Sequence, residues 1–393
     1  MKSKFASVRQ AARVGRSYAY DWAVRPRPTS ADEVPPGPES LTTRWLTEAL
    51  CKDVDAVVAS FAVEPISTGS TCRSRLSLHY DGDAAAVTRL PATLFAKSTA
   101  TFLTRLQVGA TGGMSGEVRF YKRIAPTTPI TAPIGYYGIC DRRSGRSILL
   151  LEDLARTRNV VFGDVRTPLD RAHADALVDS LATVHGCLLD SPRFTTDLKW
   201  VISSQTLQNV LNVYVDSRGR SVAGIDLAGD VLPPELPARR NDLHDYRMRA
   251  LRLDDEHPLG LVHHDVHSGN WFATDEPAMG LFDWSAYARG QGARDLAYAL
   301  MSSLTVADRR AWERDLVTRY ADALGRVCGR TQDPEATWLA YRRQTLHGLC
   351  FWLATLGSGF LQPKMQTDET SLENLRRMGQ AVADLDTFRA LDG

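Results

Sequence analysis

Apolar and polar residues follow two different periods along the chain, and the change falls near residue 155. Before it, short runs of alternating apolar and polar residues are separated by turn residues, a pattern typical of β-strands. These runs predict five strands, at 57–66, 73–80, 92–97, 134–140 and 147–151. Short helices are predicted at 41–50 and, between the third and fourth strands, at 116–124.

Beyond residue 155, apolar residues recur every three to four positions, which is the period of an amphipathic helix. Helices are predicted around 170–189, 236–253, 292–303, 306–325, 333–356 and 370–390. The expected fold class is therefore α+β, a small β-rich lobe followed by a larger, mainly helical one. The expected organisation is a basic arm with a proline-rich linker at 1–40, a β-rich domain at 41–155 and a helical domain at 156–393.

Composition narrows the possible partners. The net charge of the 393 residues is +1, so nothing in the overall balance indicates a nucleic-acid partner. The six cysteines are scattered without a CxxC pair, which argues against a disulfide framework or a zinc ribbon and favours the cytoplasm. No apolar run reaches the ~18–20 residues of a membrane span. The basic N-terminal stretch predicts a mobile arm or peripheral helix, with a targeting or membrane-surface role as the alternative.

Candidate chemistry is concentrated in residues 261–300. His263, Asp265 and Asn270 are followed by an apolar run that ends in Asp283. Phosphoryl transfer needs positioning and charge neutralisation more than covalent help from the protein. Asp265 is the candidate base for an attacking hydroxyl, while Asn270 and Asp283 carry the hard oxygen ligands that Mg²⁺ prefers. His263, grouped with the catalytic residues, is predicted to brace the loop.

Further parts of such a site occur upstream. Lys97 ends the third predicted strand, and Glu117 lies twenty residues later on the next predicted helix. An ion pair between a strand lysine and a helix glutamate is a fixed part of the kinase template. A nucleotide-covering loop is expected between the first two strands, at Gly69, Ser70 and Thr71. It lacks a full GxGxxG, and the absence of GK[ST] there excludes a P-loop. The glycine-rich run before Glu117 is interpreted as a flexible entry to its helix.

Together these segments resemble the aminoglycoside phosphotransferase and choline kinase superfamily, and most closely its ecdysteroid-kinase-like branch. The resemblance rests on ISTGSTCRSRLSLHY, LFAKS, GEVRFYKRIAP, ILLLEDL, LATVHG, HHDVHSGNW, LFDW and RDLAYAL, which run from about 41 to 305. It implies a two-lobed protein-kinase-like fold. It also implies an enzyme that uses ATP and Mg²⁺ to phosphorylate a hydroxyl of a small organic molecule.

The resemblance also implies roles for residues outside the catalytic loop. The backbone of Glu152, Asp153 and Leu154 would meet adenine at the hinge between the lobes. Asp295, in RDLAYAL, would brace the catalytic loop, with an exposed acid at a helix start as the alternative.

Two positions depart from common kinase patterns. The family often has glycine where this chain has His264, a change that constrains the catalytic loop but leaves its acids in place. Trp284 follows Asp283, where protein kinases have Phe-Gly. This resembles the small-molecule branch and argues against a protein substrate.

Two rival functions remain open at this stage. A metal-dependent hydrolase would use the cluster of His263, His264, Asp265 and His267. That hypothesis leaves Lys97 and the order of the two lobes unexplained. A catalytically inactive kinase fold that acts as a binding protein would be expected to have lost the base or a metal ligand, and neither is missing here.

The acceptor is the least specified part of the prediction. Aromatic residues at helical spacing predict core packing, with lining of the acceptor site as the alternative: Trp338, Tyr341, Phe351, Trp352 and Phe360. If they line the site, an apolar alcohol is favoured, such as a sterol-like or polyketide-like molecule. An antibiotic is the other acceptor class expected. A polycationic aminoglycoside would require a cluster of carboxylates. The oligomeric state and the choice between ATP and GTP stay open.

Overall fold

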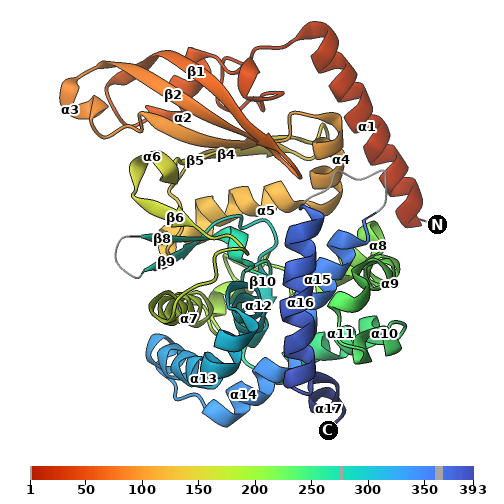
Figure 1. Ribbon diagram of the computed structural model, residues 1–393. Coiled ribbons are helices and arrows are strands. Elements are labelled where there is room, and N and C mark those ends of the chain that lie inside the picture. Colours follow the sequence, from red (N-terminus) through yellow and green to blue (C-terminus); the bar gives the residue numbers. More distant parts are fainter. Residues whose placement is uncertain (1, 275–277, 359–365) are drawn as a thin grey trace. The chain divides into compact units, whose positions relative to one another are not determined.

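The computed structural model describes residues 2–274, 278–358 and 366–393. The chain forms two compact units, one of Met1–Thr127 with Pro133–Asn159 and one of Thr128–Ala132 with Val160–Gly393 (Figure 1). The first unit is built around a sheet and the second is mainly helical. This arrangement confirms the predicted α+β fold class.

The first unit contains a five-stranded antiparallel sheet with the order β1-β2-β3-β5-β4. All five predicted strands are present: β1 Ala56–Thr68, β2 Cys72–Gly82, β3 Thr93–Ser98, β4 Gly135–Asp141 and β5 Arg146–Glu152. In this register Lys97, on the central strand β3, lies opposite Arg73 on one side and Leu149 on the other. The strand pattern is readable from the sequence because side chains alternate between the two faces.

Each face of the sheet is covered by a helix. On one face, α2 (Thr43–Leu50) buries Trp45 against apolar strand residues such as Ala96. On the other face, α5 (Gly113–Arg119) brings Val118 against β4 and β5, so close to Gly138 that a Cβ there would lie 3.2 Å from it. Because neighbouring strand residues point to opposite faces, Ala96 faces α2 while Lys97 faces α5.

The segment that leads to Glu117 is helical, so the prediction of a flexible entry is wrong. Helix α4 (Phe102–Thr111) precedes α5, and the two are separated only at Gly112. Gly112 has a φ of 72°, in the left-handed region that glycine adopts without strain. Beyond α5 the chain continues through a π-helical turn, Phe120–Ile124, and a 3₁₀ turn, Ala125–Thr127. The left-handed conformation of Gly112 therefore lets the chain change direction between α4 and α5 without an intervening loop.

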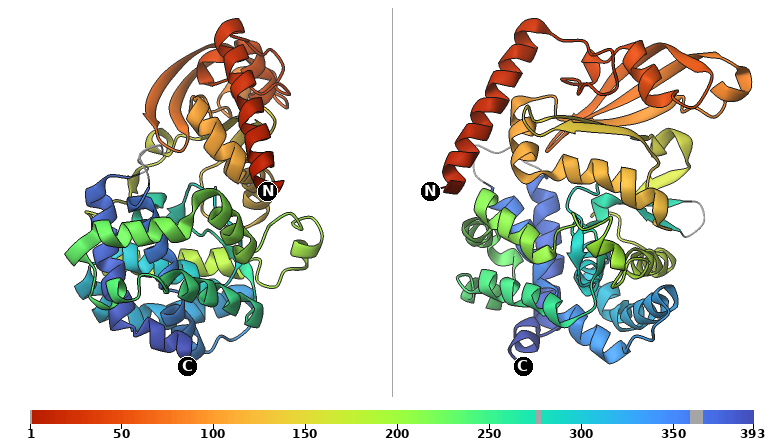
Figure 2. Two further views of the ribbon diagram at one scale, coloured as in Figure 1. Left: turned by 90° about the vertical axis from the view of Figure 1, so that its right-hand side faces the viewer. Right: turned by 180° about the vertical axis from the view of Figure 1, so that it is seen from behind.

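The N-terminal arm forms a peripheral helix, α1 (Lys2–Val24), which packs against α4 (Figure 2). The rings of Tyr18 and Phe102 lie 5.8 Å apart across this contact. Buried Asp21 forms ion pairs with Arg105 of α4, at 2.7 Å, and with Arg146 of β5. The proline-rich segment that follows α1 is irregular except for a 3₁₀ turn at Pro38–Ser40.

The second unit is a helical bundle with two short sheets. Its longer helices are α7 Arg171–Gly186, α8 Ser204–Val215, α9 Ser217–Ala228, α11 Leu243–Arg252, α12 Ala293–Ser303, α13 Val306–Cys328, α14 Pro334–Arg343, α15 Leu346–Leu356, α16 Asp368–Asp384 and α17 Thr387–Asp392. The short sheets have the orders β6-β8-β9 and β10-β7, with β6 Val160–Phe162, β7 Gly260–Val262, β8 Trp271–Thr274, β9 Met279–Leu281 and β10 Ala288–Gly290. Helix α12 is buried along its whole length at the centre of the bundle. Within the described ranges, no helix is long and apolar enough to cross a membrane.

In the second unit, helices α8 and α9 were not predicted from the sequence. Helix α9 is rich in small and polar residues and has little apolar periodicity. It packs closely on α15, where a Cβ added to Gly224 would lie 2.1 Å from the carbonyl oxygen of Leu353. This close contact is possible because Gly224 has no side chain. It therefore produces no periodic pattern of apolar residues in the sequence. The predicted helix at 333–356 is divided into α14 and α15.

We expect Asp21→Asn to loosen α1. The substitution leaves Arg105, which is 1% exposed, without its counter-charge, and loss of one member of a buried pair costs about 3 kcal/mol. The free energy of unfolding in urea should fall by about that amount, and trypsin should cut faster between α1 and α2. Asp53→Asn, which changes an exposed acid, is the matched control. Unchanged stability and cleavage rate would show that the ion pairs do not hold α1.

Candidate active site

The predicted site residues fall into two groups, one in each unit. The first unit contains Lys97, Glu117, Gly69, Ser70, Thr71, Glu152, Asp153 and Leu154. The second contains His263, Asp265, Asn270 and Asp283.

In the first unit, Lys97 and Glu117 form a buried ion pair. The Lys97 Nζ lies 3.0 Å from Oε1 and 2.8 Å from Oε2 of Glu117. Lys97 is 4% exposed and Glu117 is 0% exposed, so both charges depend on buried partners. The pair fixes α5 to the central strand and holds the ammonium group at one position on the sheet.

The loop at Gly69–Thr71 is a tight hairpin turn between β1 and β2. The Gly69 N–H donates to the carbonyl oxygen of Thr71 at 3.0 Å. Cys72, the next residue, lies opposite Ser98 of β3, so the turn is at the same end of the sheet as Lys97. The Thr71 side chain is buried, and its Oγ1 has no hydrogen-bond partner in the described part of the chain.

The acids at the end of β5 are used within the first unit. Glu152 accepts hydrogen bonds at 2.7 Å from Nε and Nη2 of Arg158, and at 3.1 Å from the Ile134 N–H. Burial acts to raise the pKa of Glu152, but these hydrogen bonds hold it below its usual value. Asp153 accepts from Arg75 Nε at 2.5 Å. Both carboxylates therefore stabilise the chain where it leaves β5. Because these side chains are engaged, only the backbone here would be available for the predicted adenine contact.

The catalytic loop of the second unit is built on Asp295. Its Oδ2 accepts from the backbone N–H of His263 at 2.5 Å, and its Oδ1 accepts from that of His264 at 3.0 Å. Asp295 lies in the first turn of α12 and is 0% exposed, so the alternative of an exposed acid is wrong. On the side of α7, His185 Nε2 lies 3.3 Å from Oδ2, and its Nδ1 lies 2.7 Å from the hydroxyl of Tyr320.

Burial alone would raise the pKa of Asp295. The hydrogen bond with His185 and the nearby rings of His263 and His264 act in the opposite direction and lower it to about 2. The carboxylate is therefore charged at neutral pH and can hold both loop N–H groups.

His263 connects the loop to the strand that precedes Asp283. Its Nδ1 accepts from the Asp265 N–H at 3.2 Å, and its Nε2 lies 3.0 Å from the carbonyl oxygen of Phe282, to which it donates. Burial lowers the pKa of His263, which keeps the ring neutral with one donor and one acceptor nitrogen. Both ring nitrogens form hydrogen bonds with backbone groups, so the His263 side chain holds the loop in place.

Asp265 is half-buried, and both of its carboxylate oxygens have donors. Oδ1 accepts from the Tyr298 hydroxyl at 3.2 Å, and Oδ2 accepts from Asn270 Nδ2 at 3.2 Å. Sequence reasoning missed Tyr298. The available signal was its position three residues after Asp295, on the same face of α12.

Asn270 and Asp283 lie at the ends of two paired strand regions. The Asn270 Nδ2 donates to the Asp265 carbonyl oxygen at 2.7 Å, which leaves the side-chain oxygen to act as a ligand. The Asn270 carbonyl oxygen accepts from the N–H of Phe282, the residue before Asp283, at 3.1 Å. Asp283 has a φ of 60°, an uncommon conformation for a residue other than glycine. The fold thus places an amide oxygen and a carboxylate on adjacent segments.

His264 occupies a backbone conformation suited to glycine, with a φ of 72°. Left-handed backbone costs a side-chain-bearing residue roughly 1–2 kcal/mol. Several contacts offset this cost. The His264 Nε2 lies 2.7 Å from Ser204 Oγ, and its carbonyl oxygen lies 2.9 Å from Nε2 of His347.

The three loop histidines have separate partners. His263 contacts backbone groups, His264 contacts Ser204, and the His267 Nδ1 accepts from the Gly269 N–H at 3.0 Å. In the described ranges, no group of three or more His, Cys, Asp or Glu residues is arranged to hold a metal ion.

The aromatic residues suggested for the acceptor site divide between core and loop. Tyr341 is buried, stacks with Trp338 at 5.5 Å and donates to Glu313 at 2.9 Å. Trp352, on α15, packs edge to face against the ring of His267 at 5.4 Å. Phe351 is half-buried, and Phe360 lies outside the described residues.

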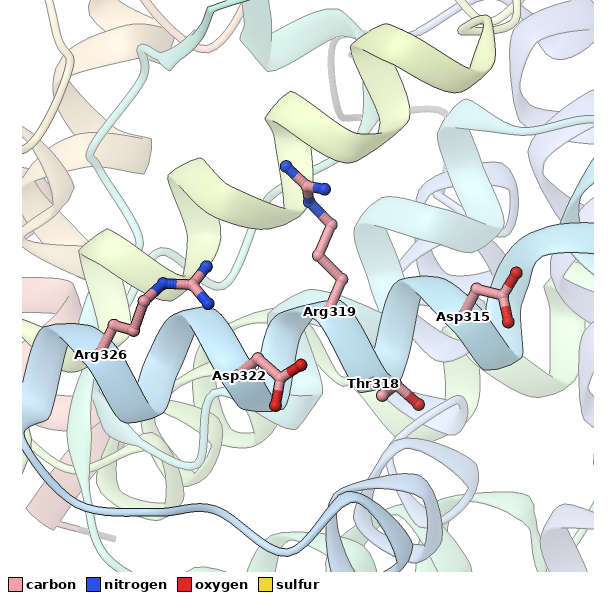
Figure 3. A pocket seen from close by; sticks show the side chains of 5 residues that line it. All are labelled: Asp315, Thr318, Arg319, Asp322 and Arg326. Carbon is pink, nitrogen blue, oxygen red and sulfur yellow. The ribbon is translucent and has the colours of Figure 1, made fainter.

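A depression of about 400 Å³ lies on α13. None of the predicted site residues lines it. It is lined by Asp315, Thr318, Arg319, Asp322 and Arg326 (Figure 3). Arg319 is already paired with Asp179 at 2.6 Å. The depression offers no arrangement of acid, base or nucleophile comparable with the catalytic loop.

Comparison with known proteins identifies the class. Residues 94–330 match the APH family, described as the phosphotransferase enzyme family, and this is more than half of the chain. The protein belongs to that family. Membership confirms the predicted superfamily and the expectation of an enzyme that acts as a small-molecule kinase.

Solved structures of low sequence identity are similar to this chain, and one with a TM-score above 0.5 shares its fold. Choline kinase from Cryptosporidium parvum Iowa II is 13% identical with a TM-score of 0.52, and the match covers 84% of this chain and 91% of that chain. Macrolide 2′-phosphotransferase MphH from Brachybacterium faecium is 14% identical with a TM-score of 0.42, covering 76% and 84%. No functionally curated protein matches the sequence.

We expect native stability to decrease as the pH falls from 7.5 to 5. Burial lowers the pKa of His264 to about 3 and lowers the pKa of His263 and His347, whereas an unfolded histidine titrates near 6.5. Below pH 6.5 the unfolded chain therefore takes up more protons at these three positions than the native protein does. His264 should cost about 1.4 kcal/mol of unfolding free energy per pH unit, and His263 and His347 should add to this loss.

Urea titrations at several pH values measure this slope. His264→Asn should reduce it, while His79→Asn, which changes an exposed histidine, should leave it unchanged. Equal stability of the unmodified protein at pH 7.5 and 5 would contradict the assignment of neutral buried rings.

Proposed function

We propose that the protein is an O-phosphotransferase that uses ATP and Mg²⁺ to transfer the γ-phosphoryl group to a hydroxyl of a small organic molecule. The observation that carries this proposal is the way in which hydrogen bonds hold Asp265 and its loop. Its loop is fixed by Asp295, and its two oxygens are oriented by Tyr298 and Asn270. A carboxylate that is oriented but half-exposed suits a base that must reach a substrate hydroxyl.

The donor set suits magnesium. Asn270 supplies an amide oxygen because its nitrogen is used in the loop, and Asp283 supplies a carboxylate. In a kinase, Mg²⁺ usually has about two oxygen ligands from the protein, and its other ligands are phosphate oxygens and water. When bound, the ion neutralises charge that develops on the transferred group.

The first unit supplies groups for the nucleotide. The Lys97 ammonium, held by Glu117, is assigned to the phosphates, and the turn at Gly69–Thr71 is assigned to cover them. The backbone at Glu152–Leu154 is assigned to adenine. Lys97, the base and both metal ligands are all present, as an active enzyme requires.

Asp265 is assigned to accept the proton of the acceptor hydroxyl, a role that contributes ~10²–10⁴-fold in rate. Asp295 and His263 act through the loop, as positioning residues. Tyr298 is assigned the same kind of role, because its hydroxyl fixes one oxygen of the base.

The proposed acceptor is an apolar alcohol, sterol-like or polyketide-like, or an antibiotic of that kind. Trp352 contacts the catalytic loop through His267, and α15 carries no acidic residue. A polycationic acceptor would favour carboxylates there. We also propose the ecdysteroid-kinase-like branch, which rests on the HHDVHSGNW, LFDW and RDLAYAL segments, and a cytoplasmic location, which suits the six free cysteines.

Thermal unfolding tests the proposal without knowledge of the acceptor. ATP with Mg²⁺ at 100 times the dissociation constant should stabilise the protein by about 2.7 kcal/mol. Asp283→Asn should lose that gain because it removes a metal ligand. Asp265→Asn should retain it and lose turnover, and Asp322→Asn, at an exposed position, is the matched control.

The opposite pattern would reject the proposal. If ATP with Mg²⁺ leaves the unfolding midpoint unchanged while Zn²⁺ alone raises it, the histidines of the loop would become the site and a hydrolase would be favoured.

A further inference from the structure

One cross-strand row of the five-stranded sheet carries two cations side by side. Arg73 on β2 lies directly opposite Lys97 on β3, and Ser67 on β1 lies opposite Arg73 on its other side. Residues that lie opposite each other in paired strands point to the same face of the sheet. Arg73 therefore points to the same side of the sheet as Lys97, which is the side that α5 covers.

The two cations differ in how their charge is neutralised. Lys97 is paired with Glu117 at 2.8 Å and is 4% exposed. Arg73 is half-buried, and among the described residues no carboxylate forms an ion pair with it. Its side chain has a weak partner there, the Ser67 hydroxyl at 3.5 Å from Nη1. The row therefore carries one positive charge that no neighbouring acid compensates.

A second arginine on the same face shows the contrast. Arg75 lies two residues further along β2, so its side chain points to the same face as that of Arg73. It is paired with Asp153 at 2.5 Å and with Glu64 at 3.3 Å. Arg75 is thus already engaged by acids, whereas Arg73 is available to an anion that comes from outside the chain.

The guanidinium group of Arg73 lies at the turn that we assign to the phosphates. A Cβ added to Gly69 would lie 3.8 Å from Arg73 Nη1, so this charge is beside the turn. Thr71, two residues before Arg73, has a buried hydroxyl without a hydrogen-bond partner in the part of the chain that the structure describes. An unpaired guanidinium, the Lys97 ammonium and an unpartnered hydroxyl are thus gathered at one end of the sheet.

We propose that Arg73 binds the phosphate groups of the nucleotide beside Lys97, and that it gives the site a preference for nucleotides with two or three phosphates. A planar guanidinium can donate two parallel hydrogen bonds to one phosphate group, which an ammonium group cannot do. The inference rests on the proposed function, because the nucleotide is assigned to this turn and to Lys97 there.

The position of Arg73 predicts different effects on the free and the nucleotide-bound protein. Like charges that lie directly opposite each other in a strand pair destabilise the sheet. Without nucleotide, Arg73→Gln should therefore leave the free energy of unfolding unchanged or raise it. With nucleotide, the same substitution removes a charged donor to the phosphates. A residue needed only for the fold would instead lower the stability of the free protein when it is replaced.

Isothermal titration calorimetry of the full-length chain with ATP, ADP and adenosine, in the presence of Mg²⁺, tests the proposal. Arg73→Gln should weaken ATP and ADP binding about 10- to 100-fold, as expected for lost hydrogen bonds to a charged group, and leave adenosine binding unchanged. Arg73→Lys keeps the charge but not the paired donors, so it should recover part of the loss. Arg89→Gln is the matched control, since Arg89 is exposed and precedes the end of β3 opposite to Lys97.

The possible failures of this inference and of the proposed function differ. Equal ATP affinity of the unmodified protein and Arg73→Gln would overturn the inference while leaving the nucleotide site in place. So would an equal loss of affinity for ATP and adenosine, because Arg73 would then act through the shape of the turn. If the unmodified protein bound neither ATP nor ADP, the proposed function would fail and this inference with it.

Discussion

The catalytic loop depends on one buried carboxylate. Asp295 accepts hydrogen bonds from the backbone N–H groups of His263 and His264, at 2.5 and 3.0 Å. Asp265 directly follows His264 in the chain. Two backbone hydrogen bonds to a charged group are stronger than neutral ones, and a buried charge cannot be left without them. The need to satisfy Asp295 therefore fixes the backbone immediately before the proposed base.

This constraint explains the unusual residues around it. His264 donates its N–H to Asp295 and has a φ of 72°. The strain of this backbone conformation is offset by the contact of its ring with Ser204 and of its carbonyl oxygen with His347. A glycine would reach the same conformation without strain but also without those contacts. The histidines must stay neutral for this network to form, which makes the stability of the loop sensitive to acid.

The first unit uses buried charge in a similar way. The Lys97 ammonium depends on Glu117, and Asp21 depends on Arg105 and Arg146. One pair fixes a group that we assign to the nucleotide, and the other fixes α1 to its own unit. In both cases a pair of buried charges joins a helix to another element, so position is defined by electrostatics as well as by apolar packing.

Much of the fold and of the candidate site could be read from the sequence, because the relevant signals are local. Alternation of apolar residues predicted the five strands, and the spacing of Asp265, Asn270 and Asp283 pointed to the segment proposed to be catalytic. What the sequence could not supply were features that depend on contacts between distant residues. Examples are helix α9, which packs through glycine backbone on α15, and the Tyr298 hydroxyl on Asp265, 33 residues away. Local patterns carry no record of such contacts, so only the tertiary structure decided them.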